Sequence, residues 1–188
     1  MNATVTLGHP RRLFFAYWPD AAARRALLDA TRAAVAAIDG QPVGPTSLHV
    51  TIAFIGKVPG ARIPDLMRIG GRGDYPAADL RFDHLEYWPR AKAVVALPEM
   101  IPAAGQRLVE VLWERLQPLE FEREARAWRP HVTIVRRMRR PPPRLAIAGV
   151  HWPCNRLALV ESMSAPDGMH YTALAEWPLG SHSAAARG

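Results

Sequence analysis

The tetrapeptide His49-Val50-Thr51-Ile52 recurs 82 residues later as His131-Val132-Thr133-Ile134. Each copy lies in an apolar, β-branched run that follows turn-forming or proline-containing sequence, a pattern that predicts a buried strand. Because side chains alternate along a strand, the His and Thr of each copy share one face, and the Val and Ile take the other. The repeat therefore predicts two strands that pack an apolar face inside and turn a polar face toward a cleft.

One such strand by itself is usually a half-buried strand whose polar side chains form local hydrogen bonds. The repetition is harder to ascribe to strand propensity, since β-propensity does not favour histidine. We therefore expect the two imidazoles and the two threonine hydroxyls to surround one small volume.

Composition indicates an ordinary globular protein that is long enough to bury a substantial core, with 188 residues, 49% apolar and 22% charged. The net charge of +7 suits a polyanionic partner such as RNA, although a GC-rich genome would give the same excess of arginine. The single cysteine, Cys154, excludes an internal disulfide and a cysteine-rich zinc site. Neither a signal peptide nor a membrane span is indicated, so we expect a cytoplasmic protein.

Hydrophobic periodicity and turn residues divide the chain into strands and helices. The longest expected helix begins after Asp20, with Leu28, Thr31, Val35 and Ile38 at helical spacing. A second helix has Leu108, Val111, Leu112 and Leu116 on its inner face. The expected strands span residues 12–17, 48–55, 80–88, 91–97, 132–135, 145–152, 156–162 and 170–177, and the expected helices span 21–38, 65–69 and 102–117.

The turns at Pro89 and Asp167 are too tight for parallel crossovers, so neighbouring strands should be antiparallel. The sequence predicts an α+β fold with two pseudo-symmetric lobes, each an antiparallel sheet with helices on its outer face, that enclose a central cleft. Residues 1–10 are expected to be a flexible leader, 11–179 a single bilobal domain, and 180–188 a disordered tail. How the strands pair is left open.

Two facing histidines are suited to moving protons in both directions, because the unperturbed imidazole pKa lies near neutrality. One imidazole, His49 or His131, would take a proton from a nucleophile, while the other would give one to the leaving group. The hydroxyls of Thr51 and Thr133 would donate hydrogen bonds to a charged centre. Because neither copy contains an acidic residue, we expect an anionic substrate, and a strained cyclic phosphodiester would react without a metal.

Other kinds of site have weaker support. A zinc ion needs three or four protein ligands, and His84, His151 and His170 do not lie at ligand spacing from the repeat, so no metal or other cofactor is expected. Cys154 is interpreted as a small buried residue, and no serine lies in an elbow-like glycine context.

Duplicated His-x-Thr-x sequences in a chain of this size resemble the two-histidine phosphoesterase superfamily, and within it the RNA 2',3'-cyclic phosphodiesterases, also called 2'-5' RNA ligases. The resemblance extends to residues 12–16, 48–56 and 129–136, and to the closing segments 159–161, 166–168, Tyr171 and 177–179. It implies hydrolysis of RNA or nucleotide 2',3'-cyclic phosphates to 2'-phosphomonoesters, with His49 as proton donor and His131 as proton acceptor. It also implies that the enzyme can join RNA ends through a 2'-5' linkage.

Two side chains near the repeat are assigned from strand alternation. Arg136 lies an odd number of residues from His131, so a regular strand would point it away from the cleft, and it contacts phosphate only if the strand bends or ends there. Phe54 lies opposite to Thr51 by the same count and is expected in the core.

The alternative hypothesis is a non-catalytic RNA-binding module that uses an arginine-rich loop for phosphate contacts. The arginines of this loop are Arg136, Arg137, Arg139, Arg140 and Arg144. The sequence leaves open the physiological RNA, the base preference, ligation in the cell, the oligomeric state and, by itself, which histidine is the acid.

Overall fold

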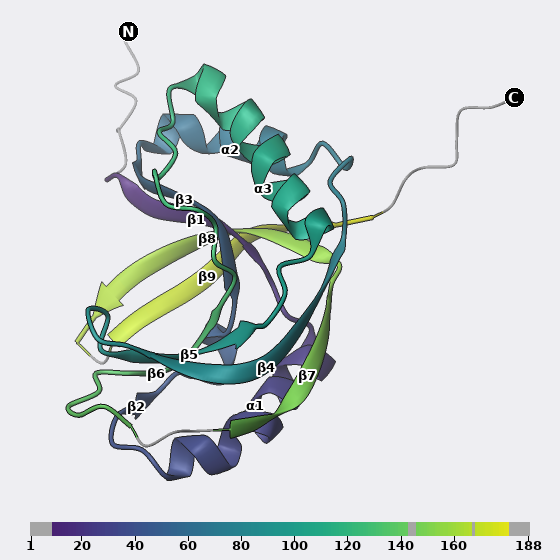
Figure 1. Ribbon diagram of the computed structural model, residues 1–188. Coiled ribbons are helices and arrows are strands. Elements are labelled where there is room, and N and C mark those ends of the chain that lie inside the picture. Colours follow the sequence, from purple (N-terminus) through teal and green to yellow (C-terminus); the bar gives the residue numbers. More distant parts are fainter. Residues whose placement is uncertain (1–8, 143–145, 167, 181–188) are drawn as a thin grey trace, which may run out of the picture.

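Two antiparallel sheets carry the two copies of the repeat, one copy in each (Figure 1). The computed structural model describes residues 9–142, 146–166 and 168–180. One sheet has the strand order β3-β1-β8-β9, and its strands are β1 (Arg11–Tyr17), β3 (Val50–Val58), β8 (Arg156–Ala165) and β9 (Gly168–Pro178). The other has the order β2-β6-β5-β4-β7, and its strands are β2 (Gln41–Pro42), β4 (Ala78–Trp88), β5 (Ala93–Pro98), β6 (Val132–Arg136) and β7 (Ala146–Cys154). The α+β fold with two sheets is thus confirmed.

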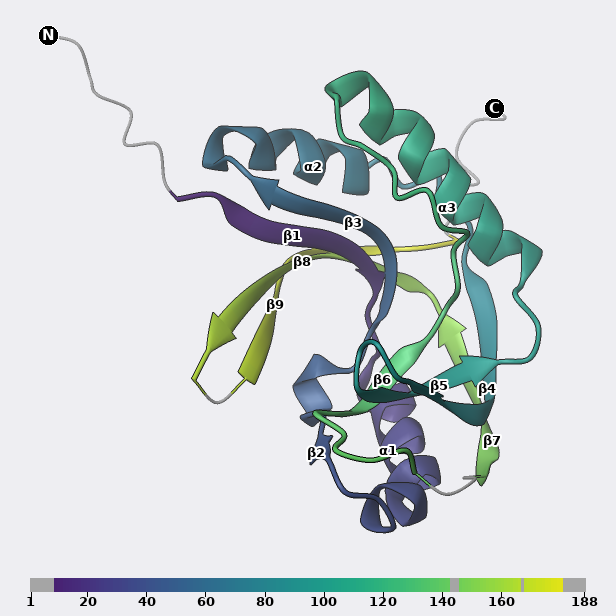
Figure 2. The ribbon, with the colours of Figure 1, turned by 60° about the vertical axis from the view of Figure 1, so that its left-hand side comes forward.

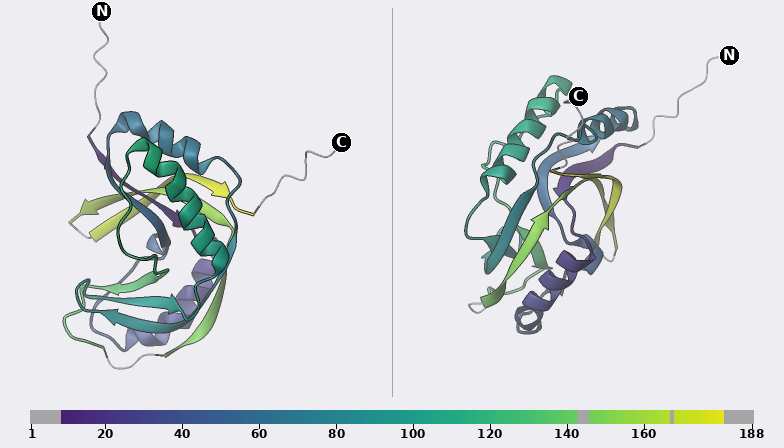
Figure 3. Two further views of the ribbon diagram at one scale, coloured as in Figure 1. Left: turned by 45° about the horizontal axis from the view of Figure 1, so that its top comes forward. Right: turned by 90° about the vertical axis from the view of Figure 1, so that its right-hand side faces the viewer.

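Three α-helices cover the outer faces of the sheets in the described part of the chain: α1 (Ala21–Ala36), α2 (Ile63–Gly70) and α3 (Ala103–Leu116). Short 3₁₀ turns lie at Pro45–Ser47, Gly60–Arg62 and Gln117–Leu119. Helices α2 and α3 pack on the sheet with the first copy of the repeat, whereas α1 packs on β6 and β7 of the other sheet. Figures 1 and 3 show α2 and α3 on one side of the molecule and α1 on the opposite side.

The two lobes are not the two halves of the sequence. The β8–β9 hairpin, from the end of the chain, pairs with β1, while the β4–β5 hairpin pairs with β6 and β7. Helix α1, from the first half, covers the sheet that holds the second copy of the repeat. One core cluster joins Leu13 and Phe15 of β1 to Val94 of β5 and Val132 of β6, so the lobes share an interior.

Both long helices are placed as expected, but their inner faces differ in detail. The Asp20 side chain caps α1 by accepting a hydrogen bond from the Ala23 N–H at 2.8 Å, as predicted. The helix ends at Ala36 rather than Ile38, and Leu27, Thr31 and Ala34 are its deeply buried residues.

The residues predicted for the inner face of α1 (Leu28, Val35 and Ile38) are only half-buried. Small alanines let the helix lie close to the sheet, which leaves these larger side chains at the edge of the contact. In α3, likewise, Val109 and Trp113 are buried and Val111 is half-buried.

The isoleucine of each copy of the repeat is unpaired in its strand, and β3 skips a second residue, Ile55, further along. Along β3, Thr51 pairs with Ala16 and Ala53 with Phe15, which skips Ile52. Along β6, Thr133 pairs with Val95 and Val135 with Val94, which skips Ile134. A bulge of one residue reverses the alternation of side chains beyond it.

The bulges change the faces assigned to two side chains. Phe54 pairs with Phe14, two residues from the Ala16 that pairs with Thr51, so Phe54 lies on the Thr51 face. The prediction that Phe54 lies opposite to Thr51 is therefore wrong. The bulge at Ile134 likewise places Arg136 on the same face of β6 as Thr133. This is the irregularity in the strand that Arg136 needs in order to face the cleft.

Several sequence-based expectations fall outside the described residues. These are most of the predicted leader (residues 1–8), most of the predicted tail (181–188), and Arg144 of the basic loop. Within the described ranges, no helix has the length and apolar character needed to cross a membrane.

The close approach of α2 to β9 gives a test of the packing. A Cβ added at Gly70 would lie 2.3–2.7 Å from the ring of Trp177, too close without a shift of either element. We expect Gly70→Ala to destabilise the protein by about 1–3 kcal/mol and to lower the melting temperature by several degrees in a thermal unfolding experiment. Gly44→Ala is the control, since its Cβ meets nothing within 4 Å, and an equal effect of both changes would contradict the packing.

Candidate active site

The two histidines of the repeat are held in the same way. Each directly precedes its strand, and its Nδ1 bonds to the carbonyl two residues earlier: His49 to Ser47 at 2.7 Å and His131 to Arg129 at 2.8 Å. A carbonyl only accepts, so Nδ1 carries the hydrogen in both neutral rings. This leaves Nε2 of each ring as the basic nitrogen.

The two copies converge on one region of the molecule. The Trp128 indole N–H, three residues before His131, donates to the Thr51 carbonyl at 2.9 Å and so ties the second copy to the first. A cavity of about 680 Å³ is lined by both Thr51 and His131. The positive charges of Arg136 and of protonated His131 both lower the pKa of His49, so the three side chains lie within electrostatic reach of one another.

The threonines of the repeat face the same way as the histidines. Thr51 and Thr133 are half-buried, and the residues on either side of each, such as Val50 and Ile52, are buried. Neither threonine hydroxyl has a hydrogen-bond partner within the ranges that the structure describes, so both are free to donate to a ligand. The predicted arrangement of polar and apolar faces in the repeat is confirmed.

His49 lies among aromatic rings. Its ring centroid is 4.9 Å from that of Phe14, 4.7 Å from that of Tyr171 and 6.1 Å from that of Trp18. Burial lowers the pKa of His49 to about 4, the hydrogen bond to Ser47 opposes this, and the positive charges of Arg136 and His131 add to it.

His131 has a more open setting, with Trp88 at 4.4 Å between ring centroids. Burial lowers its pKa too, and the positive charges of Arg136, Arg129 and Arg126 reinforce the shift. Both histidines are therefore mostly neutral at pH 7 in the ligand-free protein. This differs from the expectation that unperturbed pKa values would keep one of them charged.

Arg136 brings a positive charge to the histidines without a carboxylate beside it. Its guanidinium donates to the Tyr171 hydroxyl at 3.2 Å, and no described acidic residue forms an ion pair with it. Arg136 ends β6 and Tyr171 lies in β9, so this hydrogen bond joins the two sheets. A cation next to two neutral imidazoles and two free hydroxyls forms a site for an anion.

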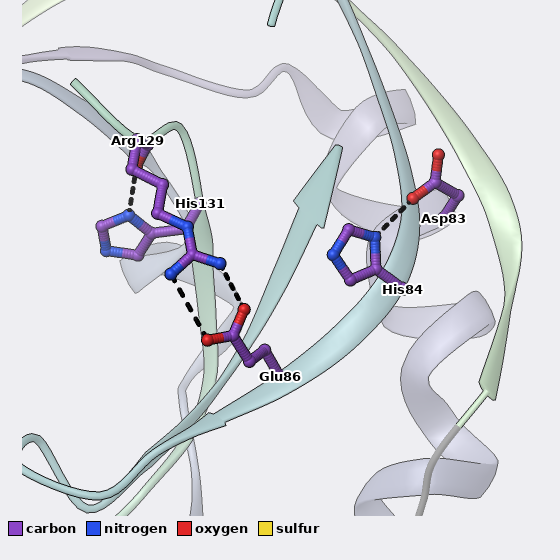
Figure 4. Close-up of polar contacts among 5 residues, drawn as sticks. All are labelled: Asp83, His84, Glu86, Arg129 and His131. Carbon is purple, nitrogen blue, oxygen red and sulfur yellow. Dashed lines mark hydrogen bonds and ion pairs between the residues drawn. The ribbon is translucent and has the colours of Figure 1, made fainter. Parts of the chain in front are cut away.

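Several side chains around His131 were not assigned to the site from the sequence. Figure 4 shows the Arg129 guanidinium paired with Glu86 while its backbone carbonyl accepts the hydrogen bond from His131. The Arg129 guanidinium also lies 5.3 Å from the ring centroid of Trp88. The only sequence signal for these contacts was the tryptophan-arginine-proline run before His131, because the partners come from β4.

Two of the other histidines considered as metal ligands, His84 and His151, lie in separate pairs. His84 bonds to Asp83 at 2.6 Å and lies apart from His131 in Figure 4, and His151 pairs with Asp79 at 3.1 Å. Across the described ranges, no group of three or more His, Cys, Asp or Glu side chains could hold a metal ion. Cys154 is buried, which raises the pKa of its thiol and disfavours the reactive thiolate.

Comparison with known proteins gives concordant results. The family model of the 2'-5' RNA ligase superfamily matches residues 18–164. The RNA 2',3'-cyclic phosphodiesterase of Thermus thermophilus is 32% identical over 179 residues, covering 89% of this chain and 90% of that protein. The RNA 2',3'-cyclic phosphodiesterase of Escherichia coli is 27% identical, covering 92% and 99%.

Solved structures show the same fold. The crystal structure of E. coli LigT complexed with 3'-AMP superposes with a TM-score of 0.77 at 24% identity, covering 91% of this chain and 99% of that one. The crystal structure of TT0787 of T. thermophilus superposes with a TM-score of 0.76 at 28% identity, covering 89% and 97%.

The burial of the two histidines gives a test by pH titration. When the pKa of a histidine is lower in the folded protein than in the unfolded chain, the unfolded chain binds more protons at any pH between the two pKa values. The free energy of unfolding therefore falls as the pH drops through this range. We expect the His49 ring protons to titrate near pH 4 and those of His131 below pH 6.5 in NMR spectra of the ligand-free protein. The stability contribution of His49 should accordingly be lost between about pH 6.5 and 4. A midpoint at or above 6.5 for both rings would contradict the burial described here.

Proposed function

The chain belongs to the 2'-5' RNA ligase superfamily, whose family model covers most of its length, and on this basis we propose that it is an RNA 2',3'-cyclic phosphodiesterase. It opens terminal 2',3'-cyclic phosphates of RNA or nucleotides to 2'-phosphomonoesters, without a metal ion. The observation that carries this proposal is the pair of like-oriented imidazoles, His49 and His131, beside Arg136, with which no described acidic residue pairs.

The phosphate of the substrate lies between the two histidines. The hydroxyls of Thr51 and Thr133 donate to its non-bridging oxygens, and Arg136 balances its negative charge. An anion close to an imidazole favours the protonated form, so binding raises the pKa values that burial and Arg136 lower in the free protein. Substrate binding thus lets one histidine take up the proton that the reaction uses.

The surroundings of the two rings support the assignment of their roles. His131 lines the cavity that Thr51 also lines, which has room for an attacking oxygen. The Nε2 atom of His131 takes the proton of the attacking water. His49 lies among Phe14, Trp18 and Tyr171, which exclude water from the side of the departing oxygen. The bond from phosphorus to the 3'-oxygen breaks, and His49 gives its proton to that oxygen, which leaves a 2'-phosphate and a free 3'-hydroxyl.

Arginines on the surface fit an RNA substrate. Arg137, Arg139 and Arg140 follow Arg136 and are exposed, and no described acidic residue pairs with them. A basic stretch beside the phosphate site attracts the rest of a polyanionic chain. RNA binding without catalysis is the second candidate function, and it rests on this basic stretch alone.

Removing either imidazole tests the chemistry. We expect His49→Ala and His131→Ala each to lower the turnover of a nucleoside 2',3'-cyclic phosphate at least about a hundredfold, because each removes one partner in proton transfer. Turnover by the unaltered protein should survive EDTA, and phosphorus NMR should identify the product as the 2'-phosphate.

His84→Ala is the matched control, since His84 pairs with Asp83 outside the cleft, and it should retain activity. A 3'-phosphate product, or full turnover in either variant of the repeat, would refute the assigned roles. RNA binding that depends on salt but not on either histidine, with no turnover, would favour the non-catalytic module.

The position of Arg136 on the cleft face of β6 gives a second test. We expect Arg136→Ala to lower kcat/KM about tenfold or more, since it removes a charged hydrogen-bond donor from the phosphate. It should also raise the pKa of both histidines, because their positive forms no longer face the guanidinium. Arg107→Ala, which removes an exposed arginine of α3, is the control for net charge, and equal kinetics of the two variants would contradict the phosphate contact.

A further inference from the structure

A second cavity, of about 310 Å³, borders the candidate site on the side of His49. Arg136 and Tyr171 line it, and the guanidinium donates to the phenol hydroxyl at 3.2 Å. Tyr171 also contacts the His49 ring, with 4.7 Å between the ring centroids. The turn after β2 and the β8–β9 hairpin complete the lining, and we call this space the hairpin cavity.

Arg137 brings a second guanidinium to the hairpin cavity. Strand β6 ends at Arg136, and regular alternation would point the next side chain to the opposite face. Arg137 instead has a left-handed backbone, with a φ of 55°, which turns the chain there. As a result, two arginines that are adjacent in the sequence line the same cavity.

The backbone of Arg137 is held in place from both sides. Before it, Arg136 pairs with Gln41 of β2. After it, Met138 is buried, and its N–H donates to the Lys92 carbonyl at 2.9 Å. A left-handed backbone is unfavourable for a side chain of this size, and it persists where the surroundings impose it, most often at functional sites. The position of Arg137 is therefore a built feature of the fold.

The remaining lining of the hairpin cavity suits a phosphate. The hydroxyls of Thr46, Ser47 and Ser164 lie in its walls and can donate hydrogen bonds. No acidic residue lines the cavity or forms an ion pair with Arg137 in the part of the chain that the structure describes. Guanidinium and hydroxyl donors without a competing carboxylate form a site for phosphate oxygens.

The covalent structure of the substrate shows which phosphate could reach this cavity. In the proposed reaction the 3'-oxygen leaves on the side of His49, opposite to the attacking water. That oxygen is bonded to C3' of the ribose, and the neighbouring C4' carries the 5'-carbon and its oxygen. The 5' end of the reacting nucleotide therefore extends from His49 toward the hairpin cavity.

We propose that the hairpin cavity binds the phosphate on the 5'-oxygen of the nucleotide that carries the cyclic phosphate. This inference rests on the proposed function, in which His49 serves the departing 3'-oxygen. Arg136 balances the charge of the reacting phosphate, and Arg137 binds the second phosphate. The enzyme consequently selects substrates with this second phosphate over plain nucleoside 2',3'-cyclic phosphates. The second phosphate is either a monoester on a single nucleotide or the diester that continues an RNA chain.

Two substrates compared on the same protein test the hairpin cavity. The kcat/KM is measured for uridine 2',3'-cyclic phosphate and for the same compound with a phosphate on its 5'-oxygen. Damage to the chemistry at the histidines affects both substrates, so it cancels in the ratio of the two values. We expect the unaltered protein to favour the 5'-phosphorylated substrate about tenfold or more, because it gains a charged hydrogen bond.

Replacing Arg137 should remove this preference. We expect Arg137→Asn to lower the ratio about tenfold, since asparagine loses the charge but tolerates a left-handed backbone. Arg137→Lys should retain part of the preference, because the positive charge remains. Arg107→Asn is the matched control, since Arg107 is an exposed arginine of α3 outside the cavity, and its ratio should equal that of the unaltered protein.

A dinucleotide identifies the source of the second phosphate. Uridylyl-(3'-5')-uridine with a terminal 2',3'-cyclic phosphate carries the same group as a diester. If Arg137→Asn also lowers its advantage over uridine 2',3'-cyclic phosphate, the cavity binds the phosphate of an RNA chain. If the loss is confined to the 5'-monoester, the cavity serves single nucleotides.

Other outcomes would overturn one or both proposals. If no cyclic phosphate is opened, the proposed function fails, and this inference fails with it. If cyclic phosphates are opened but neither second phosphate is preferred, or if Arg137→Asn leaves both preferences unchanged, the hairpin cavity is overturned while hydrolysis stands.

The neighbouring basic residues provide a further discrimination. Arg139 is exposed and does not line the hairpin cavity, although it belongs to the same basic stretch as Arg137. Equal losses of preference in Arg137→Asn and Arg139→Asn would show that the basic surface as a whole attracts the second phosphate, and would overturn the inference.

Discussion

An unpaired isoleucine within each copy of the repeat decides which side chains face the cleft. Ile52 and Ile134 have no partner on the neighbouring strand, and both isoleucines stay in the apolar interior. The histidine and threonine before the bulge and the second residue after it therefore share a face. This shift places Arg136 on the face of the two imidazoles, where its charge acts on both of them.

The electrostatics of the site fit the anionic substrate of the proposed function. Burial and the Arg136 charge lower the pKa of both histidines, so the free cleft contains a fixed positive charge and two neutral bases. The Nδ1 hydrogen bonds to the carbonyls of Ser47 and Arg129 fix the ring orientation before any ligand arrives. In the proposed reaction, a phosphate between the rings would relieve the repulsion that disfavours their protonation, and binding would then be linked to proton uptake.

Each half of the chain contributes elements to the sheet that holds the other half's copy of the repeat, so both halves are needed to form the cleft. Helix α1 supports the sheet of the second copy, and the β8–β9 hairpin completes the sheet of the first, as Figures 1 and 2 show. The contacts from Trp128 to Thr51 and from Arg136 to Tyr171 bridge the two sheets at the site itself. Neither half could form its wall of the cleft alone, so a change at one lobe should be felt at the other.

The sequence by itself determined the α+β class, most element positions and the polar face of each His-x-Thr-x strand, because these depend on local periodicity and turn residues. It did not determine the strand pairing, the faces of Phe54 and Arg136, or the lowered pKa values of the histidines. A bulge depends on the register between two strands, and burial depends on the packing of distant elements. Neither can be predicted from the residue spacing within one segment. The cavity lined by Thr51 and His131 likewise lies where β3, the end of β4, α3 and the loop before β6 meet, which the tertiary structure alone decided.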